Sequence, residues 1–146
     1  MESEHITQLS ASIGEQNYTC TVQDSRHMYI IDEPESKGGA NLGPNPMSVL
    51  LASLASCIAI TLKMYAERKG IVTGKINVNV ELQQSGSGKN IKSTFLRKIQ
   101  VENAIEVDQM ERLNYIATVC PVSRLLSGEI EMKNIVTNGE EDHEKV

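Results

Sequence analysis

The sequence has few aromatic residues and no excess of basic ones. It contains no tryptophan and one phenylalanine in 146 residues, and its formal net charge is −5. Nucleic-acid-binding proteins usually combine a basic surface with interleaved aromatic side chains, so this composition argues against that class. The contents of 40% hydrophobic and 23% charged residues are ordinary for a globular protein. We expect a single domain over residues 1–138 that buries about two thirds of its unfolded surface.

Cysteines are also scarce. Three of them, Cys20, Cys57 and Cys120, are too widely spaced, and odd in number, for an extracellular disulfide framework. Residues 1–4 are acidic and no apolar segment follows them, so no secretory signal is expected. A metal site built from Cys57, Cys120 and His27 is conceivable, but the C-x-x-C and H-x-x-x-H spacings are missing. We therefore expect a cytoplasmic protein with free thiols and without a metal or cofactor.

Residues 46–62 carry no charge on any face. Asn45 can cap the free amides of a helix that begins here, Pro46 suits the first helical position, and Gly70 can end the helix. Its apolar part is only about sixteen residues, short of the ~20 that a bilayer requires. A helix that is apolar all round must be buried all round. We predict a long soluble helix, buried in a core or against a partner chain, and no membrane contact.

Alternating apolar and polar residues predict strands on both sides of this helix. In the second strand, the alternation places Cys20 on the same inward face as Tyr18 and Val22, where a cysteine acts as a small hydrophobe. The order of strands and helices indicates an α+β fold with antiparallel sheets around the long helix. The expected strands are residues 9–13, 18–23, 26–32, 75–82, 95–101 and 129–136.

A second helix is expected to begin at Asp108, because an acceptor side chain stands there three residues before a Glu. Pro121 breaks this helix, and a shorter helix over residues 121–127 follows. Cys120 then lies at the N-terminal end of the shorter helix, where the helix dipole favours a thiolate. The acidic tail, residues 139–146, is expected to be disordered.

Two segments resemble the signatures of the OsmC/Ohr family, and the likeness runs from about residue 32 to residue 130. The first contains Gly38-Gly39, Gly43-Pro44-Asn45-Pro46 and Leu50-Leu51-Ala52-Ser53-Leu54-Ala55-Ser56-Cys57, and the second is Cys120-Pro121-Val122-Ser123-Arg124-Leu125-Leu126. The resemblance implies an intertwined homodimer with the long helices at its centre. It also implies that the two helical cysteines face each other near the dimer interface.

The family chemistry is the reduction of organic hydroperoxides, so the resemblance makes Cys57 the attacking cysteine and Cys120 the resolving one. Such a reaction is chemically reasonable, because a thiolate attacks a peroxide to give a sulfenic acid and a second thiol converts that acid to a disulfide. An external thiol or dithiol must then reduce the disulfide. The partners expected are thus a second copy, a small hydroperoxide and a thiol reductant.

The sequence departs from active members of the family at two positions. They usually carry a Glu directly after the helix-starting proline, paired with an Arg from an N-terminal segment. Here Met47 follows that proline, and Gln16 stands roughly where the arginine would be. Arg26 is the best substitute for a cation that serves Cys57, and Arg124 is the second. Apolar surroundings raise a thiol pKa, and without the Glu after Pro46 the arginine that serves Cys57 is less well held, so its thiolate is less stabilised. We therefore expect peroxidase activity that is slow and that prefers bulky organic hydroperoxides to hydrogen peroxide. The alternative is a non-enzymatic redox sensor, or a dimer that binds a small apolar ligand.

Overall fold

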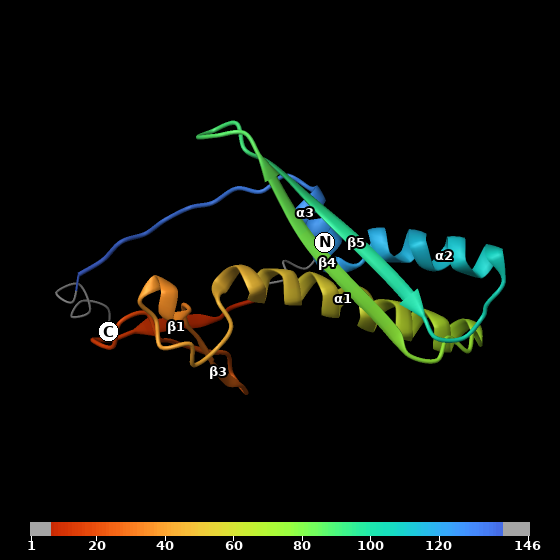
Figure 1. The fold of residues 1–146 in the computed structure, drawn as a ribbon, viewed down its shortest axis with the longest axis horizontal. Coiled ribbons are helices and arrows are strands. Elements are labelled where there is room, and N and C mark those ends of the chain that lie inside the picture. Colours follow the sequence, from red (N-terminus) through yellow and green to blue (C-terminus); the bar gives the residue numbers. More distant parts are fainter. Residues whose placement is uncertain (1–6, 139–146) are drawn as a thin grey trace, which may run out of the picture.

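The structure, a computed structural model, describes residues 7–138 and confirms the α+β class with antiparallel sheets. One sheet contains β1, β2 and β3, and β4 and β5 form a separate two-stranded hairpin. Figure 1 shows the three-stranded sheet near the start of α1, while the long hairpin crosses α1 obliquely and α2 and α3 pack beside them. The elements are β1 (Ser10–Ile13), β2 (Cys20–Gln23), β3 (Met28–Ile31), the 3-10 turn η1 (Glu35–Lys37), α1 (Pro46–Lys69), β4 (Ile76–Ser85), β5 (Lys92–Val101), α2 (Val107–Thr118) and α3 (Pro121–Ser127).

Helix α1 has the ends that the sequence predicts. The Asn45 side chain accepts a hydrogen bond of 2.8 Å from the backbone N–H of Ser48. Pro46 occupies the first helical position, where its missing N–H leaves no bond unmade. Gly70 has φ of 67°, in the left-handed region that glycine adopts at little cost, and its N–H bonds back to the last turn.

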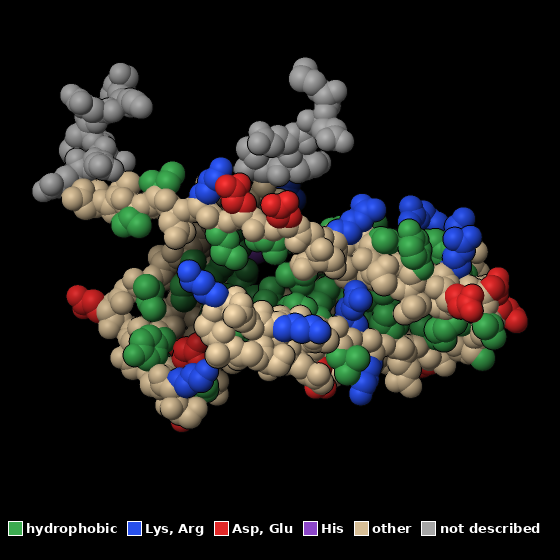
Figure 2. Space-filling view, turned by 90° about the horizontal axis from the view of Figure 1, so that it is seen from above, with side chains coloured by type: hydrophobic (Ala, Val, Ile, Leu, Met, Phe, Trp, Pro, Cys, Tyr) green, Lys and Arg blue, Asp and Glu red, His purple; other side chains and the backbone are tan. Residues whose placement is uncertain are grey.

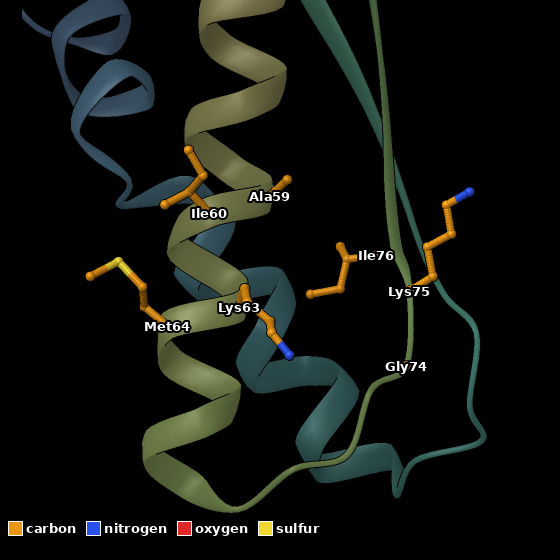
Figure 3. Close-up of a pocket in the computed structure, with 7 residues that line it drawn as sticks. All are labelled: Ala59, Ile60, Lys63, Met64, Gly74, Lys75 and Ile76. Carbon is orange, nitrogen blue, oxygen red and sulfur yellow. The ribbon is translucent and has the colours of Figure 1, made fainter.

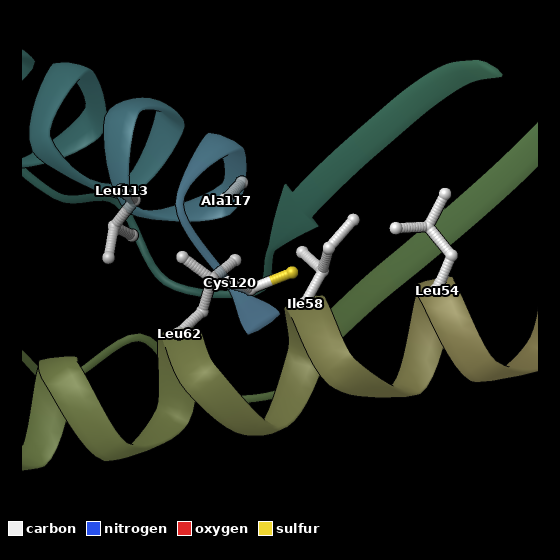
Figure 4. Close-up of a cluster of buried hydrophobic side chains, with 6 residues drawn as sticks. All are labelled: Leu54, Ile58, Leu62, Leu113, Ala117 and Cys120. Atoms are coloured by element: carbon white, nitrogen blue, oxygen red, sulfur yellow. The ribbon is translucent and has the colours of Figure 1, made fainter. Parts of the chain in front are cut away.

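The core lies between one face of α1 and the facing sides of α2 and α3 (Figure 4). On α1, Leu54, Ile58 and Leu62 are spaced four residues apart, so they point in the same direction. They pack with Leu113 of α2 and with Ala117 and Cys120, and the inward row of the hairpin closes the cluster. The hairpin residues that contact it are Ile76, Val78, Val80, Phe95, Ile99 and Val101.

The opposite face of α1 is not covered in the single chain. Leu50, Ile60 and Met64 are 37%, 60% and 59% exposed, so one chain buries only one face of the helix, and burial of the other face against a partner chain stays a prediction. Figure 3 shows Ile60 and Met64 projecting away from β4, and Figure 2 shows apolar side chains open to solvent on the surface. A cavity of about 420 Å³ opens beside them. One small hairpin and two short helices can cover only one side of a 24-residue helix.

Three local predictions are wrong. Helix α2 is capped by Glu106, whose side chain and that of Gln109 form the capping box, so the helix begins before Asp108. Cys20 and Val22 turn inward, whereas Tyr18 lies before β2 and is 52% exposed. The expected last strand, residues 129–136, is extended but pairs with no strand within the described chain. The predicted disordered tail lies outside the described residues.

A buried carboxylate organises the glycine-rich connection that leads to α1. Asp32 is 1% exposed, and its oxygens accept hydrogen bonds from the Thr19 hydroxyl and from the N–H groups of Glu33, Ala40 and Leu42. Burial by itself raises the pKa of this carboxyl, but the surrounding donors outweigh it and lower the pKa from its ordinary value. One ionised side chain thus connects the start of β2 with the approach to α1.

Candidate active site

The structure brings together two of the three residues expected to form the site. Cys57 is half-buried on α1, next to the core residue Ile58, and Cys120 is completely buried at the residue that precedes α3. Cys57 packs against the buried cluster that contains Cys120, so the two thiols lie close enough for each to affect the pKa of the other. Residues 63 positions apart in sequence therefore meet because α3 packs against α1.

The surroundings of the two thiols push their pKa values in opposite directions. Burial raises the pKa of Cys57, and the neighbouring Cys120 thiol raises it further, against the lowering effect of the Val122 N–H. Burial also acts to raise the pKa of Cys120, but hydrogen bonds from Ser123, Cys57 and Val122 outweigh it, so that pKa is lowered. The ionised form is thus favoured at Cys120 rather than at Cys57.

The Ser123 hydroxyl lies next to the Cys120 thiol, and the Arg97 guanidinium lies next to that hydroxyl. The Cys120 thiol lies 3.1 Å from the Ser123 hydroxyl, to which it donates, and that hydroxyl donates to the Ala117 carbonyl at 2.9 Å. Arg97 of β5 donates to the same hydroxyl at 3.1 Å and to the Ala117 carbonyl at 3.4 Å. No carboxylate within residues 7–138 forms an ion pair with Arg97. Its positive charge is therefore not compensated by a described side chain.

Arg97 is the candidate site residue that the sequence reasoning missed. The alternation of β5 places it on the same face as Phe95 and Ile99, toward the core, while Lys98 points to solvent. The sequence signal that could have identified it is an arginine among the apolar residues on the inward face of this predicted strand. A cavity of about 290 Å³ adjoins Arg97 and Ser123, and its remaining lining residues are Leu54, Ser93, Thr94, Phe95, Leu126 and Ser127.

The two arginines named from the sequence lie elsewhere. Arg26 is exposed in the turn between β2 and β3, where its backbone N–H donates to Asp24. That turn belongs to the three-stranded sheet, apart from α2 and α3 (Figure 1). Arg124 is exposed on α3, although its backbone N–H bonds to the Cys120 carbonyl. The predicted role of Arg26 at Cys57 remains a prediction that depends on the placement of a second copy.

No group of three His, Cys, Asp or Glu side chains suited to a metal ion occurs within residues 7–138. Helix α1 is the one helix of that part of the chain that is long and apolar enough, by length and composition alone, to cross a membrane. Both observations leave the thiol pair, with Ser123 and Arg97, as the chemically distinctive feature of the described residues.

Comparison with solved structures shows the same fold in several proteins. An OsmC-like protein from Mycoplasma pneumoniae is 20% identical with a TM-score of 0.66, covering 88% of this chain and 90% of that one. An organic hydroperoxide resistance protein from Legionella pneumophila is 19% identical with a TM-score of 0.64, covering 87% and 93%. The organic hydroperoxide resistance protein OhrB of Bacillus subtilis is 21% identical with a TM-score of 0.58, covering 85% and 92%.

A comparison with curated proteins gave no match. The family model for OsmC-like proteins matches residues 38–134, a range that holds α1, the β4–β5 hairpin, α2, α3 and both site cysteines. Helix α1 is the long helix on which the hairpin, α2 and α3 pack in this chain. The chain belongs to the OsmC-like protein family.

Proposed function

We propose that this protein reduces organic hydroperoxides with Cys57 as the attacking thiol and Cys120 as the resolving thiol. The observation that carries the proposal is that Cys57, partly exposed, packs against the cluster that contains the buried Cys120. A peroxide can therefore reach Cys57, while Cys120 is placed to react with the oxidised product. The names of the structural relatives from Legionella pneumophila and Bacillus subtilis agree with this chemistry.

The reaction balances with groups of the chain and an external reductant. The Cys57 thiolate attacks the distal peroxide oxygen, so the O–O bond breaks and Cys57 becomes a sulfenic acid while the alkoxide leaves as an alcohol. Cys120 thiolate then attacks the Cys57 sulfur, which forms the disulfide and releases hydroxide. A thiol or dithiol supplies two electrons to restore both thiols. Cys57 packs against an apolar cluster, and apolar surroundings of this kind suit hydroperoxides with an apolar body.

The alternative is a redox sensor that forms the same disulfide without sustained turnover. Two observations favour it: Met47 stands where active family members usually have a Glu, and burial raises the pKa of Cys57. A thiol with a raised pKa is a small fraction thiolate at neutral pH, which slows attack on peroxide. Cumene hydroperoxide consumption, measured with dihydrolipoamide as the reductant, separates the two functions. Consumption of many equivalents supports the enzyme, and consumption that stops after one equivalent supports the sensor.

The disulfide itself is a second expected result. Stoichiometric cumene hydroperoxide followed by peptide mapping without reductant should recover a Cys57–Cys120 link and leave Cys20 as a free thiol, because Cys57 packs against the cluster that contains Cys120 whereas Cys20 lies in β2 of the other sheet. Cys20→Ser is the matched control, and it should give the same link in the same yield. Recovery of a link that includes Cys20, or of no link, contradicts the two-thiol mechanism.

We also propose that the protein acts as a homodimer. The uncovered face of α1 and the unpaired segment after α3 are the features that need a partner: Met132, Ile135 and Val136 are 86%, 92% and 93% exposed. Size-exclusion chromatography with light scattering should give about twice the chain mass of 16.1 kDa at micromolar concentration. Replacing Met64 by Glu should shift the mass toward one chain, whereas Glu67→Gln on the charged last turn should not. A wild-type monomer contradicts the proposal.

A further inference from the structure

We infer that Arg97 and Ser123 are positioning residues that hold Cys120 as the ionised thiol of the pair, with Cys57 as its proton-bearing partner. The inference concerns the two thiols before any peroxide arrives. It assigns a role to Arg97, which the family resemblance does not name. It also distinguishes Cys120, the thiol that ionises, from Cys57, the thiol that meets the substrate.

The geometry links the three side chains in one chain of hydrogen bonds. Arg97 donates to the Ser123 hydroxyl, and that hydroxyl is 3.1 Å from the Cys120 sulfur. Ser123 is 3% exposed and Cys120 is 0% exposed, so both side chains are shielded from bulk solvent. A hydrogen bond to a charged acceptor in such surroundings is stronger than one in water. The buried hydroxyl is therefore placed to stabilise a thiolate at Cys120.

A rotation of one hydroxyl group accommodates both states of Cys120. With Cys120 protonated, its S–H donates to the Ser123 oxygen and the Ser123 O–H donates to the Ala117 carbonyl. With Cys120 ionised, the same O–H can turn to the sulfur, since the Ala117 carbonyl keeps its bond from Arg97. Arg97 continues to donate to the Ser123 oxygen in both states, which polarises the hydroxyl and makes it a better donor.

The charged groups around Cys120 support this assignment. Cys57 packs against the cluster that contains Cys120, from α1, and its neutral thiol lowers the pKa of Cys120. Arg97 faces the same site from β5. The ionisable side chains of α2 and the Arg124 side chain of α3 are exposed, and those of β4 point to solvent on the opposite face of the strand. Arg97 is thus the one inward cation among the described neighbours.

This arrangement deepens the proposed function, on which its catalytic meaning rests. Transfer of the Cys57 proton to Cys120 creates the attacking thiolate as the peroxide arrives, so Cys120 serves as the base. The proton then passes to the departing alkoxide, and Cys120 is again ionised and ready to attack the Cys57 sulfenic acid. When a dithiol later attacks the Cys57 sulfur of the disulfide, a stabilised Cys120 thiolate is also the better leaving group.

Thiolate formation can be measured directly by ultraviolet absorbance during a pH titration, without any peroxide. In the wild type the first thiolate should form below the pH range of an ordinary cysteine, and it should disappear in Cys120→Ser but persist in Cys57→Ser. Ser123→Ala and Arg97→Met should each move this step to higher pH by about one unit, a loss of about tenfold in thiolate at neutral pH. Ser123→Thr and Arg97→Lys, which keep the hydroxyl and the charge, should restore most of the step.

Lys98→Met is the matched control, because Lys98 is the next residue of β5 and faces solvent. It should leave the titration unchanged, and circular dichroism should confirm that each variant keeps its fold. If the first thiolate disappears in Cys57→Ser instead, or if folded Ser123→Ala and Arg97→Met titrate like the wild type, the inference is wrong. Failure of peroxide turnover with the Cys120 titration intact would remove the proposed function and leave this inference standing.

Discussion

Replacing Cys57 by serine should reduce cumene hydroperoxide turnover by about a thousandfold or more, the scale on which removal of a nucleophile acts. A serine hydroxyl ionises far less readily than a thiol, and a weakly ionised oxygen does not replace the thiolate as the nucleophile. The steady-state rate of peroxide loss with dihydrolipoamide as reductant is the measurement. The substitution removes only the polarisable sulfur, so the packing of α1 against α3 should persist.

The Cys120→Ser variant provides the comparison that assigns the roles. It should still be oxidised by one equivalent of peroxide, and the product should be a sulfenic acid on Cys57 that reacts with dimedone. Mass spectrometry of the labelled peptide identifies the site of the adduct. A dimedone adduct on Cys120 in the Cys57→Ser variant, with none on Cys57 in Cys120→Ser, would reverse the assigned order of attack and resolution.

The second large effect concerns stability, and Leu62 is the position at which we expect it. The Leu62 side chain is 0% exposed and packs with Leu113 and Cys120 between α1 and α2 (Figure 4). Leu62→Ala removes buried apolar surface and leaves a cavity, so the free energy of unfolding should fall by about 3 kcal/mol. For a chain of this size the melting temperature should drop by about 10 °C.

Leu125→Ala is a suitable control for Leu62→Ala. The change of side chain is the same, but Leu125 is 63% exposed on α3, so its loss should change the unfolding free energy by about 0.5 kcal/mol or less. Thermal unfolding followed by circular dichroism at one fixed protein concentration compares the two variants. Similar melting temperatures for both variants would show that the α1–α2 contact is not a main source of stability.

The sequence was a good guide to elements whose signals are local. Asn45, Pro46 and Gly70 define the ends of α1 by rules that involve only a few neighbouring residues, and the structure has those ends. The alternation of the β4–β5 hairpin is equally local, and its two strands pair in register over ten residues each. The class and the antiparallel sheets followed from the order of these elements.

The errors arose where the outcome depends on distant parts of the chain. Residues 129–136 have the alternation of a strand, but a strand also needs a neighbour to exchange hydrogen bonds, and one chain provides none in the described range. The start of α2 is a second case, because the sequence pattern indicates Asp108, whereas Glu106 and Gln109 form the capping box in the structure.

In the candidate site, too, local sequence signals identify some residues, whereas another is placed there only by the fold. Cys57 and Cys120 were identifiable from two signatures in the sequence, because each signature is a contiguous segment. Arg97 is far from both in sequence and reaches the site through the fold of the hairpin over α1. Its inward orientation could be predicted from the alternation of β5, but its hydrogen bond to Ser123 could not, since that requires the position of α3.

The carboxylate of Asp32 has a consequence for how the molecule holds together mechanically. The three-stranded sheet and the helical part meet through the short connection before α1, and the hydrogen bonds to Thr19, Ala40 and Leu42 cross it at one point. Gly39 and Gly43 lie so close to the backbone of neighbouring residues that a side chain at either position would collide. The connection therefore acts as a short rigid joint, and it transmits the orientation of the sheet to the first turn of the helix that carries Cys57.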